Sequence, residues 1–423
     1  MIKTAIESLN EHIFQIPVID THEHIPDEEI ACANRLGFFG FFEHYVSSDL
    51  VSSGMPAEHL QALRRPDNGL TVAERWDLLA PWWPYVRTTA YGRAMLEYMR
   101  DLFAVEDITA ETVAALCDRI NETRKPGWFK IVLRDRARID KALVIRWPGQ
   151  HVEVDRDLFC AVPILDHYAM PASLTDLANL EQEAGHPIEK LNHLLQAQEA
   201  KLDAFAAKGI VAVKIFIAYQ RTLQIDRCDK ADAERALSRL LTEKSRPDFA
   251  ELKPLQDFMT RNLVALAADR KMPLQIHTGL QEGNGNYIEN SKPTLLTSLL
   301  LDFPGARFDL FHAGYPWAGE MSALAKNFAN VYADQCWMSA VSPAFSLRTL
   351  DEWIETIPAN KILAVGGDSN YVEGAYGHTK IARRLTAQVL GRKVENGYIT
   401  LSEALWLAER ILRENARELF RLE

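Results

Sequence analysis

The sequence predicts an α/β protein whose core is a (β/α)8 TIM barrel with a large α-helical insertion after strand one. Eight short runs rich in valine, isoleucine and phenylalanine recur along its 423 residues. Stretches with helical periodicity separate most of the later runs, whereas more than a hundred residues separate the first two. Apolar strands that alternate with helices are typical of a parallel sheet, and eight of them indicate a closed barrel.

The expected strands are these apolar runs, which lie at residues 17–20, 142–147, 158–165, 211–218, 273–277, 307–311, 330–334 and 362–366. Apolar residues at helical spacing predict helices between them at 191–208, 255–270, 319–328 and 347–357. Two more helical stretches follow the last strand, at 376–390 and 402–422. Ser402 is the expected N-cap of the second stretch, because serine side chains accept hydrogen bonds from the first turn of a helix.

The gap after the first strand holds further helical patterns, at 70–83, 93–103 and 110–124. We therefore expect a helical insertion at about residues 30–130, within a single barrel domain that spans residues 1–423. Enzymes of this fold keep their active sites at the carboxyl ends of the strands. The insertion would form a lid or wall over that mouth.

The composition limits the classes of function. The formal net charge of −11 comes from scattered acidic residues, which argues against broad binding to nucleic acid or to an anionic membrane. No run of about 18 apolar residues is present, and the amphipathic, charged start does not resemble a secretion signal, so we expect a cytoplasmic protein. The five cysteines lack a C-x-x-C pair and are expected to be reduced core thiols without a role. A homo-oligomer is compatible with the sequence, but no pattern indicates one.

The motif VIDTHEHI, at residues 18–25, places His22 and His24 one residue apart at the end of the first expected strand. Alternation along a strand turns both side chains toward the barrel axis. Three more polar residues end other strands: His277 the fifth, His312 the sixth and Asp368 the eighth. Because the carboxyl ends of the barrel strands meet at one mouth, we expect these five side chains to converge.

Imidazole and carboxylate groups are common ligands of zinc, so the sequence predicts one or two divalent ions at this mouth. The expected metal ligands are His22, His24, Lys214, His277 and Asp368. A metal-activated water would supply hydroxide near neutral pH, with Asp368 as general base and His277 or His312 orienting the substrate oxygen. Lys214 lies within the fourth strand, where an unpaired ammonium is costly. It either becomes a carbamate that bridges two ions, or pairs unmodified with Asp368 or with a substrate acid.

Other residues beside the strand ends are candidates for substrate binding: Tyr219, Arg221, Tyr315 and Trp317. Arg221 could clamp a carboxylate with paired hydrogen bonds, and the alternative is a salt bridge to a loop acid. Tyr315 and Trp317 either line the pocket or pack beside a turn. The turn-rich segment 279–286 predicts a binding loop after the fifth strand.

The remaining histidines have no partner at a ligand spacing. We expect His167 and His378 near the mouth, where either could touch substrate. The others are expected in surface or packing positions: His12, His44, His59, His151, His186 and His193.

On these residues, the chain resembles the amidohydrolase superfamily of metal-dependent barrels. It is most similar to the amidohydrolase 2 branch of that superfamily. This branch includes the barrel half of glutamine-synthetase fusion proteins. The resemblance rests on the segments VIDTHEHI, VKIFIAYQR, QIHTGLQEGNGN, LFHAGYPW and KILAVGGDSN. It implies metal and catalytic positions at His22, His24, His277 and Asp368, with His312 at the sixth-strand position. It also implies that Lys214 occupies the position of the carbamylated lysine in two-metal members.

The insertion and the segment after the eighth strand are also similar to uronate isomerase, a member of the superfamily that moves a proton between neighbouring sugar carbons. The segments concerned are WPYVRTTAYGRAMLEYMRDLF and GGDSNYVEGAYGHTKIARRLTAQVLG. This likeness implies that Asp368 is the base and that Arg383 or Arg384 faces the substrate. Two departures count against the same reaction, since Asn370 stands where those enzymes carry an arginine and they lack a counterpart of His312.

We therefore expect a zinc-dependent hydrolase that cleaves an amide, ester or lactone bond of a small carboxylate-bearing molecule. The alternatives on the same scaffold are a sugar-acid isomerase and a metal-dependent decarboxylase. A third alternative is a metal-binding barrel that serves as a partner-binding module without catalysis. Substrate identity depends on loop shapes and on the insertion, which these motifs do not specify.

Overall fold

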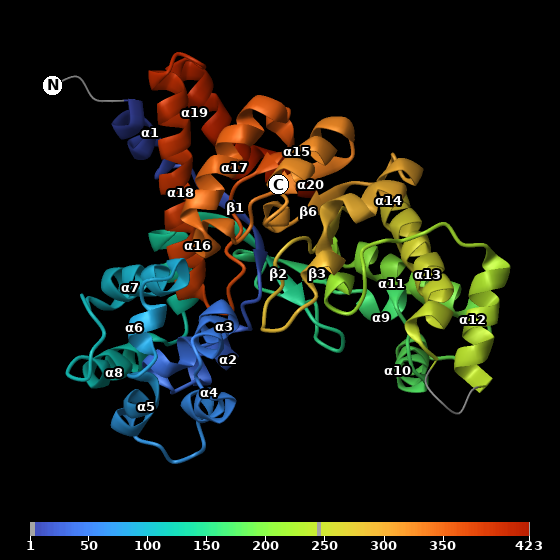
Figure 1. Cartoon of the computed structure of the whole chain (residues 1–423), viewed down its shortest axis with the longest axis horizontal. Helices are drawn as coiled ribbons and strands as arrows, with labels where there is room; N and C mark the ends of the chain where they lie inside the picture. Colours follow the sequence, from blue (N-terminus) through green and yellow to red (C-terminus); the bar gives the residue numbers. More distant parts are fainter. Residues whose placement is uncertain (1–4, 243–246, 423) are drawn as a thin grey trace.

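The computed structural model describes residues 5–242 and 247–422 (Figure 1). Parallel strands follow one another in chain order through the centre of the molecule. They are β1 (Val18–Glu23), β2 (Ile139–Arg146), β3 (Phe159–Pro163), β4 (Val213–Ile215), β5 (Leu274–Ile276), β6 (Phe308–Leu310), β7 (Val331–Asp334) and β8 (Ile362–Leu363). Each predicted run overlaps one strand, so the predicted order of strands is confirmed.

The strands form two parallel sheets that meet at two seams. β1 to β3 make one sheet and β4 to β8 make the other. A parallel bridge between Ile164 and Lys214 joins β3 to β4, and a backbone hydrogen bond from Asp368 N to His22 O (2.8 Å) joins the end of β8 to β1. The two sheets thus lie edge to edge in the (β/α)8 arrangement, with the ladders interrupted at the seams. The predicted fold class is confirmed.

Helices surround these strands. Those between β3 and β8 are α9 (Asp166–Ala169), α10 (Leu174–Ala184), α11 (Leu191–Ala207), α12 (Lys230–Thr242), α13 (Phe249–Asp269), α14 (Thr297–Asp302), α15 (Ala318–Asn327), α16 (Met338–Val341) and α17 (Pro343–Thr356). Short 3-10 turns lie at Gly37–Phe41, Ile217–Tyr219, Ile288–Ser291, Pro293–Leu296, His312–Gly314 and Ala359–Lys361. The predicted helices of this part correspond to α11, α13, α15 and α17.

Helix α1 (Ala5–Ile13) packs against two helices that follow the last strand, α18 (Val372–Glu395) and α19 (Leu401–Glu409). A π-helical segment (Arg410–Glu414) and α20 (Asn415–Phe420) follow. The N-cap of α19 is Thr400, which accepts a hydrogen bond from Glu403 N (3.2 Å), while Glu403 accepts one from Thr400 N (2.7 Å). The predicted cap, Ser402, is therefore wrong by two residues, because the reciprocal pair satisfies two backbone donors and a lone serine satisfies one.

A helical lobe lies between β1 and β2 and occupies the lower left of the view (Figure 1). It comprises α2 (Glu28–Ala33), α3 (His44–Ser52), α4 (Ala57–Arg64), α5 (Val72–Leu79), α6 (Trp83–Val86), α7 (Ala90–Phe103), α8 (Val113–Thr123) and a π-helical segment (Lys130–Arg136). Its own aromatic core includes Phe38 and Phe42, whose rings meet edge to face at 5.0 Å. Contacts of α7 with α18, and a hydrogen bond from Trp128 Nε1 to Glu373 Oε1 (2.8 Å), fix the lobe to the barrel.

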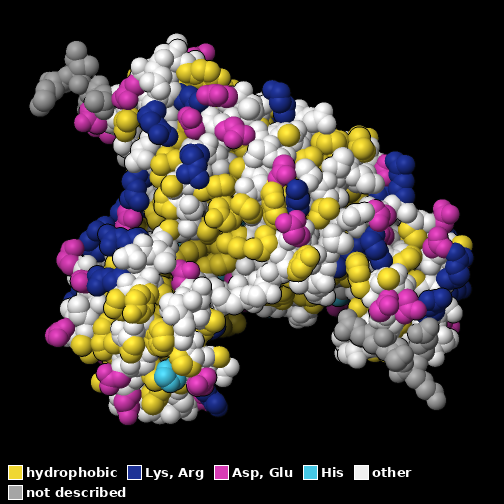
Figure 2. All heavy atoms as spheres, in the orientation of Figure 1, with side chains coloured by type: hydrophobic (Ala, Val, Ile, Leu, Met, Phe, Trp, Pro, Cys, Tyr) yellow, Lys and Arg dark blue, Asp and Glu magenta, His cyan; other side chains and the backbone are white. Residues whose placement is uncertain are grey.

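No helix among the described residues combines the length and the apolar character needed to cross a membrane. Acidic and basic side chains are interspersed over the face shown in Figure 2. All five cysteines are free thiols, as the sequence predicts.

Candidate active site

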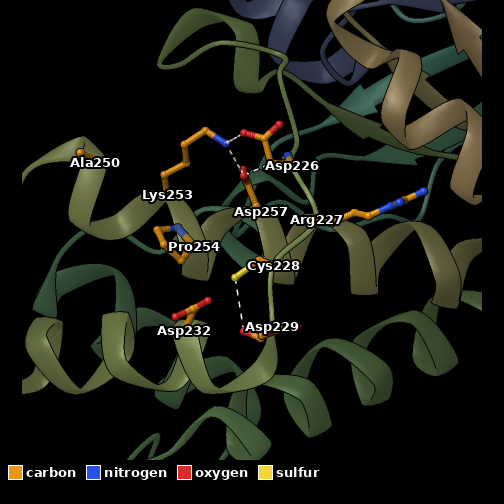
Figure 3. A pocket seen from close by; sticks show the side chains of 9 residues that line it. All are labelled: Asp226, Arg227, Cys228, Asp229, Asp232, Ala250, Lys253, Pro254 and Asp257. Carbon is orange, nitrogen blue, oxygen red and sulfur yellow. Dashed lines mark hydrogen bonds and ion pairs between the residues drawn. The ribbon is translucent and has the colours of Figure 1, made fainter.

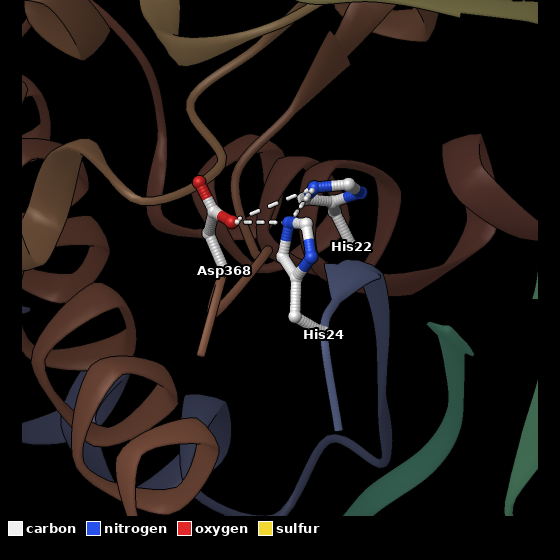
Figure 4. A group of neighbouring side chains, drawn as sticks. All are labelled: His22, His24 and Asp368. Carbon is white, nitrogen blue, oxygen red and sulfur yellow. Dashed lines mark hydrogen bonds and ion pairs between the residues drawn. The ribbon is translucent and has the colours of Figure 1, made fainter. Parts of the chain in front are cut away.

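Three of the predicted ligands meet where β1 and β8 end (Figure 4). Nε2 of His22 lies 3.2 Å from Nε2 of His24. Oδ1 of Asp368 lies 3.5 Å from the first of these nitrogens and 3.2 Å from the second. Donor atoms spaced in this way can share one ion with bonds of about 2.0–2.2 Å. The geometry therefore fits the expected metal centre.

A second pair of imidazoles follows β5 and β6. Nε2 of His312 lies 3.0 Å from Nδ1 of His277. The other nitrogen of each ring faces a backbone carbonyl, so His312 Nδ1 donates to Cys336 O (3.1 Å) and His277 Nε2 donates to Leu280 O (2.9 Å). Since a neutral imidazole carries a single N–H, two lone pairs are left facing each other. A cation bound between them would remove this repulsion, so these residues also fit a metal ion.

Burial sets the protonation states of these groups. It lowers the pKa of His22 and of His277 well below the ordinary range, and the pKa of His312 to about 4. Burial alone would raise the pKa of Asp368, but its neighbours, His44 first among them, hold that pKa well below its usual range. The site thus presents neutral nitrogen donors and an ionised carboxylate, which are the forms that bind a cation.

Two buried acids of β1 hold the loop that bears Asp368. Asp20 Oδ1 accepts a hydrogen bond from Gly367 N (3.1 Å), and Glu23 Oε2 accepts one from Ser369 N (2.7 Å). A Cβ at Gly367 would lie 1.9 Å from Glu23 Oε1, so glycine is required for this approach. We call the two acids the acid clasp. Their place in the motif VIDTHEHI is explained by this positioning of Asp368.

Lys214 lies in β4 and is fully buried. Its Nζ has no hydrogen-bonding partner among the described residues and lies 3.3 Å from the centroid of the Phe311 ring. The structure does not show the ion pair with Asp368 that was one of the expected alternatives. Burial lowers the pKa of Lys214 to about 8, which raises the share of neutral amine near neutral pH. The carbamate alternative, which starts from a neutral amine, is compatible with this environment.

A cavity of about 580 Å³ opens next to these ligands. Its lining comprises His24, His44, Arg64, Trp147, Asp166, Phe216, Tyr219, Gln220, His277, Glu282, Asp368 and Asn370. The rings of Trp147 and Phe216 are stacked, with centroids 5.6 Å apart and planes 12° from parallel. Arg64 is the one lysine or arginine in this lining. The cavity therefore offers a flat apolar wall and a single cation beside the expected metal ligands.

His44 belongs to this site, and its predicted surface or packing position is wrong. It is the first residue of α3 in the insertion, and its Nε2 lies 3.6 Å from Asp368 Oδ1. Its backbone adopts a left-handed φ of 57°, and burial lowers its pKa to about 3. No sequence spacing connects position 44 with a strand end. The one signal in the sequence that could have pointed to His44 was the expectation that the insertion covers the mouth of the barrel.

The predicted substrate residues after β4 separate in the structure. Tyr219 lines the cavity, and its hydroxyl accepts a hydrogen bond from Glu282 N (2.9 Å). Arg221 instead lies 2.6 Å from Asp257 Oδ1 on α13, and both side chains are buried. A salt bridge, the stated alternative, thus takes the place of the expected carboxylate clamp, although the acid lies on helix α13 and not on a loop. Pairing compensates the cost of burying a charge, and Arg221 and Lys253 both pair with Asp257.

Beside this pair lies a separate cavity of about 400 Å³ between the segment 226–229, α12 and α13 (Figure 3). Lys253 bridges Asp226, at 2.6 Å, and Asp257. The lysine is thus neutralised within the cluster, and histidine is absent from the cavity lining. This cavity is held by internal ion pairs and offers no set of metal-ligating nitrogens.

Tyr315 and Trp317 do not line the cavity at the strand ends. The ring of Tyr315 packs edge to face on Phe345 at 4.6 Å, and Trp317 lies 5.9 Å from Lys292 Nζ. Their expected contact with substrate is corrected to packing, which was the stated alternative. The position beside a turn proline favours packing, as the sequence also allowed.

His167 and His378 also lie outside the cavity lining. His167 pairs with Glu183 at 3.4 Å, and His378 Nδ1 donates to Gly367 O (2.6 Å). His378 thus also supports the loop that bears Asp368, through the carbonyl of Gly367, and is not part of the cavity lining.

The two arginines of α18 do not face the cavity. Arg383 is buried and donates from Nη2 to Ala137 O (3.0 Å), whereas Arg384 pairs with Glu97 on α7 at 3.0 Å. The role that the likeness to uronate isomerase implied for them is therefore wrong. Both residues fasten the insertion and the start of β2 to α18.

Comparison with known proteins finds relatives of this chain. Residues 222–422 match the family model described as Amidohydrolase. The chain is 30% identical over 233 residues to Protein fluG of Emericella nidulans. That match covers 52% of this chain and 26% of the relative, so the chain spans about a quarter of the length of the curated relative that it matches.

Solved structures share the fold along nearly the whole chain. A uronate isomerase from Thermotoga maritima superimposes with a TM-score of 0.81 at 17% identity and covers 99% of this chain and 98% of its own. A glucuronate isomerase from Caulobacter crescentus gives 0.77 at 17% identity, with 99% and 94% covered. A protein from Lactobacillus casei, described as a candidate metal-dependent hydrolase, gives 0.69 at 18% identity, with 98% and 97% covered.

Proposed function

We propose that this chain is a metal-dependent hydrolase of the amidohydrolase superfamily, which cleaves an amide, ester or lactone bond of a small carboxylate-bearing substrate. The observation that supports hydrolysis best is the second imidazole pair, His277 and His312, beside the first ligand group. Asp368 faces both groups, because its Oδ1 contacts His24 and its Oδ2 lies 3.8 Å from His312 Nε2. Such an arrangement suits two adjacent cation positions, which are common in metal-dependent hydrolases.

Zinc is the ion that we propose, in one or two copies. Neutral imidazoles with a carboxylate form a ligand set that zinc favours, and His22, His24 and Asp368 would hold the first ion. His277 and His312 would hold a second, with Lys214 as its partner if it is carbamylated. When bound, such an ion would lower the pKa of a water molecule and polarise a carbonyl group.

Asp368 is the group placed to move the proton. Its carboxylate stays ionised, because the surrounding imidazoles favour the charged form. It would accept a proton from the attacking water and return it to the leaving group. The acid clasp fixes the backbone on both sides of Asp368, and His44 contacts Oδ1 at 3.6 Å from the insertion. A base held on three sides keeps its orientation during the reaction.

Substrate binding is assigned to the insertion and to the aromatic wall. Arg64, at the end of α4, replaces Arg221 as the proposed partner of a substrate carboxylate. Its side chain is 40% exposed and lies 3.7 Å from Glu43, a distance at which an incoming acid can compete. Trp147 and Phe216 would cover the apolar part of the substrate.

A sugar-acid isomerase is the second candidate, and the contact between His44 and Asp368 favours it. A proton transfer between neighbouring carbons needs a positioned base, and His44 beside Asp368 is a second group that could take or return the proton. Asn370, which lines the cavity and donates to Glu43 (3.3 Å), supplies no positive charge next to the base. For this reason we place hydrolysis first.

The test uses the full chain with a panel of lactones, N-acyl amino acids and aryl esters, and with D-glucuronate, in water enriched in oxygen-18. We expect cleavage of one class with oxygen-18 in the product acid, loss of that activity after chelation, and its return with zinc. Unchanged cleavage by protein shown to be metal-free would contradict the proposal. Conversion of glucuronate into one product of the same carbon skeleton, without cleavage of the other compounds, would establish the isomerase instead.

A further inference from the structure

The thiol of Cys336 reaches the candidate site from β7, a strand to which the sequence assigned no ligand. Cys336 is two residues beyond the end of β7 and is completely buried. Its sulfur, a ring nitrogen of His312 and a carboxylate oxygen of Asp368 all lie within 4.8 Å of one another. All three residues are buried, so the group is shielded from bulk water.

The backbone around Cys336 is fixed by polar contacts. Cys336 N donates to Asp334 Oδ1 (2.7 Å), and its carbonyl accepts the hydrogen bond from His312 Nδ1 (3.1 Å). The same residue therefore orients the imidazole and presents the sulfur beside it. Gly366, at the end of the neighbouring strand, leaves the room for this, because a Cβ there would lie 2.7 Å from the Cys336 sulfur.

The surroundings of this thiol differ from those of an ordinary core cysteine. Buried cysteines commonly pack among apolar side chains. Here the neighbours include the carboxylate of Asp368 and Nε2 of His312, which lie 3.8 Å apart. A thiolate with an imidazole and a carboxylate is a set that zinc accepts, whereas magnesium and manganese prefer oxygen ligands.

We propose that Cys336 is a metal ligand, and that its thiolate joins His312 and Asp368 around the second of two ions. This inference rests on the proposed metal-dependent function. On binding, the S–H proton is released to solvent and a sulfur–metal bond forms, without any change of oxidation state. The second position would then prefer zinc, cobalt or cadmium to magnesium or manganese.

The experiment is absorption spectroscopy of the full chain after chelation and loading with two equivalents of Co²⁺. We expect a sulfur-to-cobalt charge-transfer band in the near ultraviolet, in addition to the visible d–d bands. Cys336→Ser and Cys336→Ala are expected to lose the near-ultraviolet band and to keep d–d absorption from the ion at His22 and His24. The matched control is Cys117→Ser, a buried thiol of α8 in the insertion, which is expected to keep the band.

The outcomes separate this inference from the proposed function. If Co²⁺ binds to the wild-type protein with d–d bands and no sulfur band, the role of Cys336 is overturned and the metal centre stands. If Co²⁺ does not bind, both proposals fail. Retention of the sulfur band in both Cys336 variants also overturns the assignment. Should these variants not fold, zinc X-ray absorption of the wild-type protein decides, with a sulfur neighbour at about 2.3 Å as the supporting result.

Discussion

The strand ends and the helical insertion both contribute to the site, but they position their residues by different means. His22, His24, His277 and Asp368 are set by parallel strands whose carboxyl ends meet by construction. His44 and Arg64 are set by how the insertion packs, through α7, against α18 of the barrel. The proposed chemistry therefore follows from strand order, whereas access to the site and contact with substrate depend on long-range packing. Variants in the two regions should therefore fail in different ways.

The largest effect is expected at the strand ends, from Asp368→Asn. The amide cannot accept the proton of the attacking water, so kcat should fall by about 10³-fold, within the range for general base catalysis. Steady-state kinetics on the cleaved substrate gives this value. Asp118→Asn, an exposed acid of α8, is the control and should retain activity. Full activity of the Asp368 variant would remove this residue from the mechanism.

Arg221→Met tests the claim that this arginine serves stability. Loss of Arg221 leaves Lys253 as the cation paired with Asp257, so the free energy of unfolding should fall by about 1.5–3 kcal/mol, the range for a hydrogen bond to a charged group. Urea unfolding measures the change. Arg239→Met removes an exposed partner of Glu251 and should cost less than about 1 kcal/mol. A raised KM with unchanged stability would return Arg221 to the substrate site.

His44→Gln tests whether the insertion contributes to catalysis separately from the residues proposed to hold the metal ion. We expect kcat to fall by about 10²-fold, because the imidazole beside Asp368 is lost, while the metal content stays as in the wild type. Elemental analysis alongside kinetics checks both parts, with His24→Ala as the comparison that should lose metal. A metal-free His44 variant would show that the insertion takes part in holding the ion.

Arg64→Met should have the smallest effect. If this residue contacts a substrate carboxylate, its loss raises KM by about tenfold with little change in kcat, since a binding contact made equally before and during reaction affects KM alone. The measurement is the ratio of the two constants for the acid substrate and for its methyl ester. An equal effect of the variant on both compounds would argue against a carboxylate at Arg64.

Much of the fold follows from local sequence. Apolar runs of strand length and helical spacing gave every barrel strand and the helices α11, α13, α15 and α17. The cap of α19 was misplaced because Ser402 and Thr400 are both suitable, and the partner Glu403 decides between them. The expected ligands at the strand ends were also predictable, because the order of the strands alone brings His22, His24 and Asp368 together.

The errors at the site have a common cause, which is pairing between distant segments. Arg221 was expected to bind substrate because it follows a strand, but it forms a buried ion pair with Asp257 on α13 instead. His44 and Arg64 lie in the insertion, where no regular spacing fixes the distance to a strand end. Cys336 was given no role because a single cysteine has no spacing pattern, although β7 delivers it to the same mouth.

The acid clasp has a consequence for how the protein becomes functional after synthesis. Glu23 and Ser369 are separated by 346 positions in the chain, yet their hydrogen bond holds the base beside the first histidines. In the proposed metal centre, the ion-binding site of a nascent chain is complete only after the last strand has left the ribosome and docked on the first. Cation uptake should report that the whole ring has been assembled, and truncated products should remain unloaded.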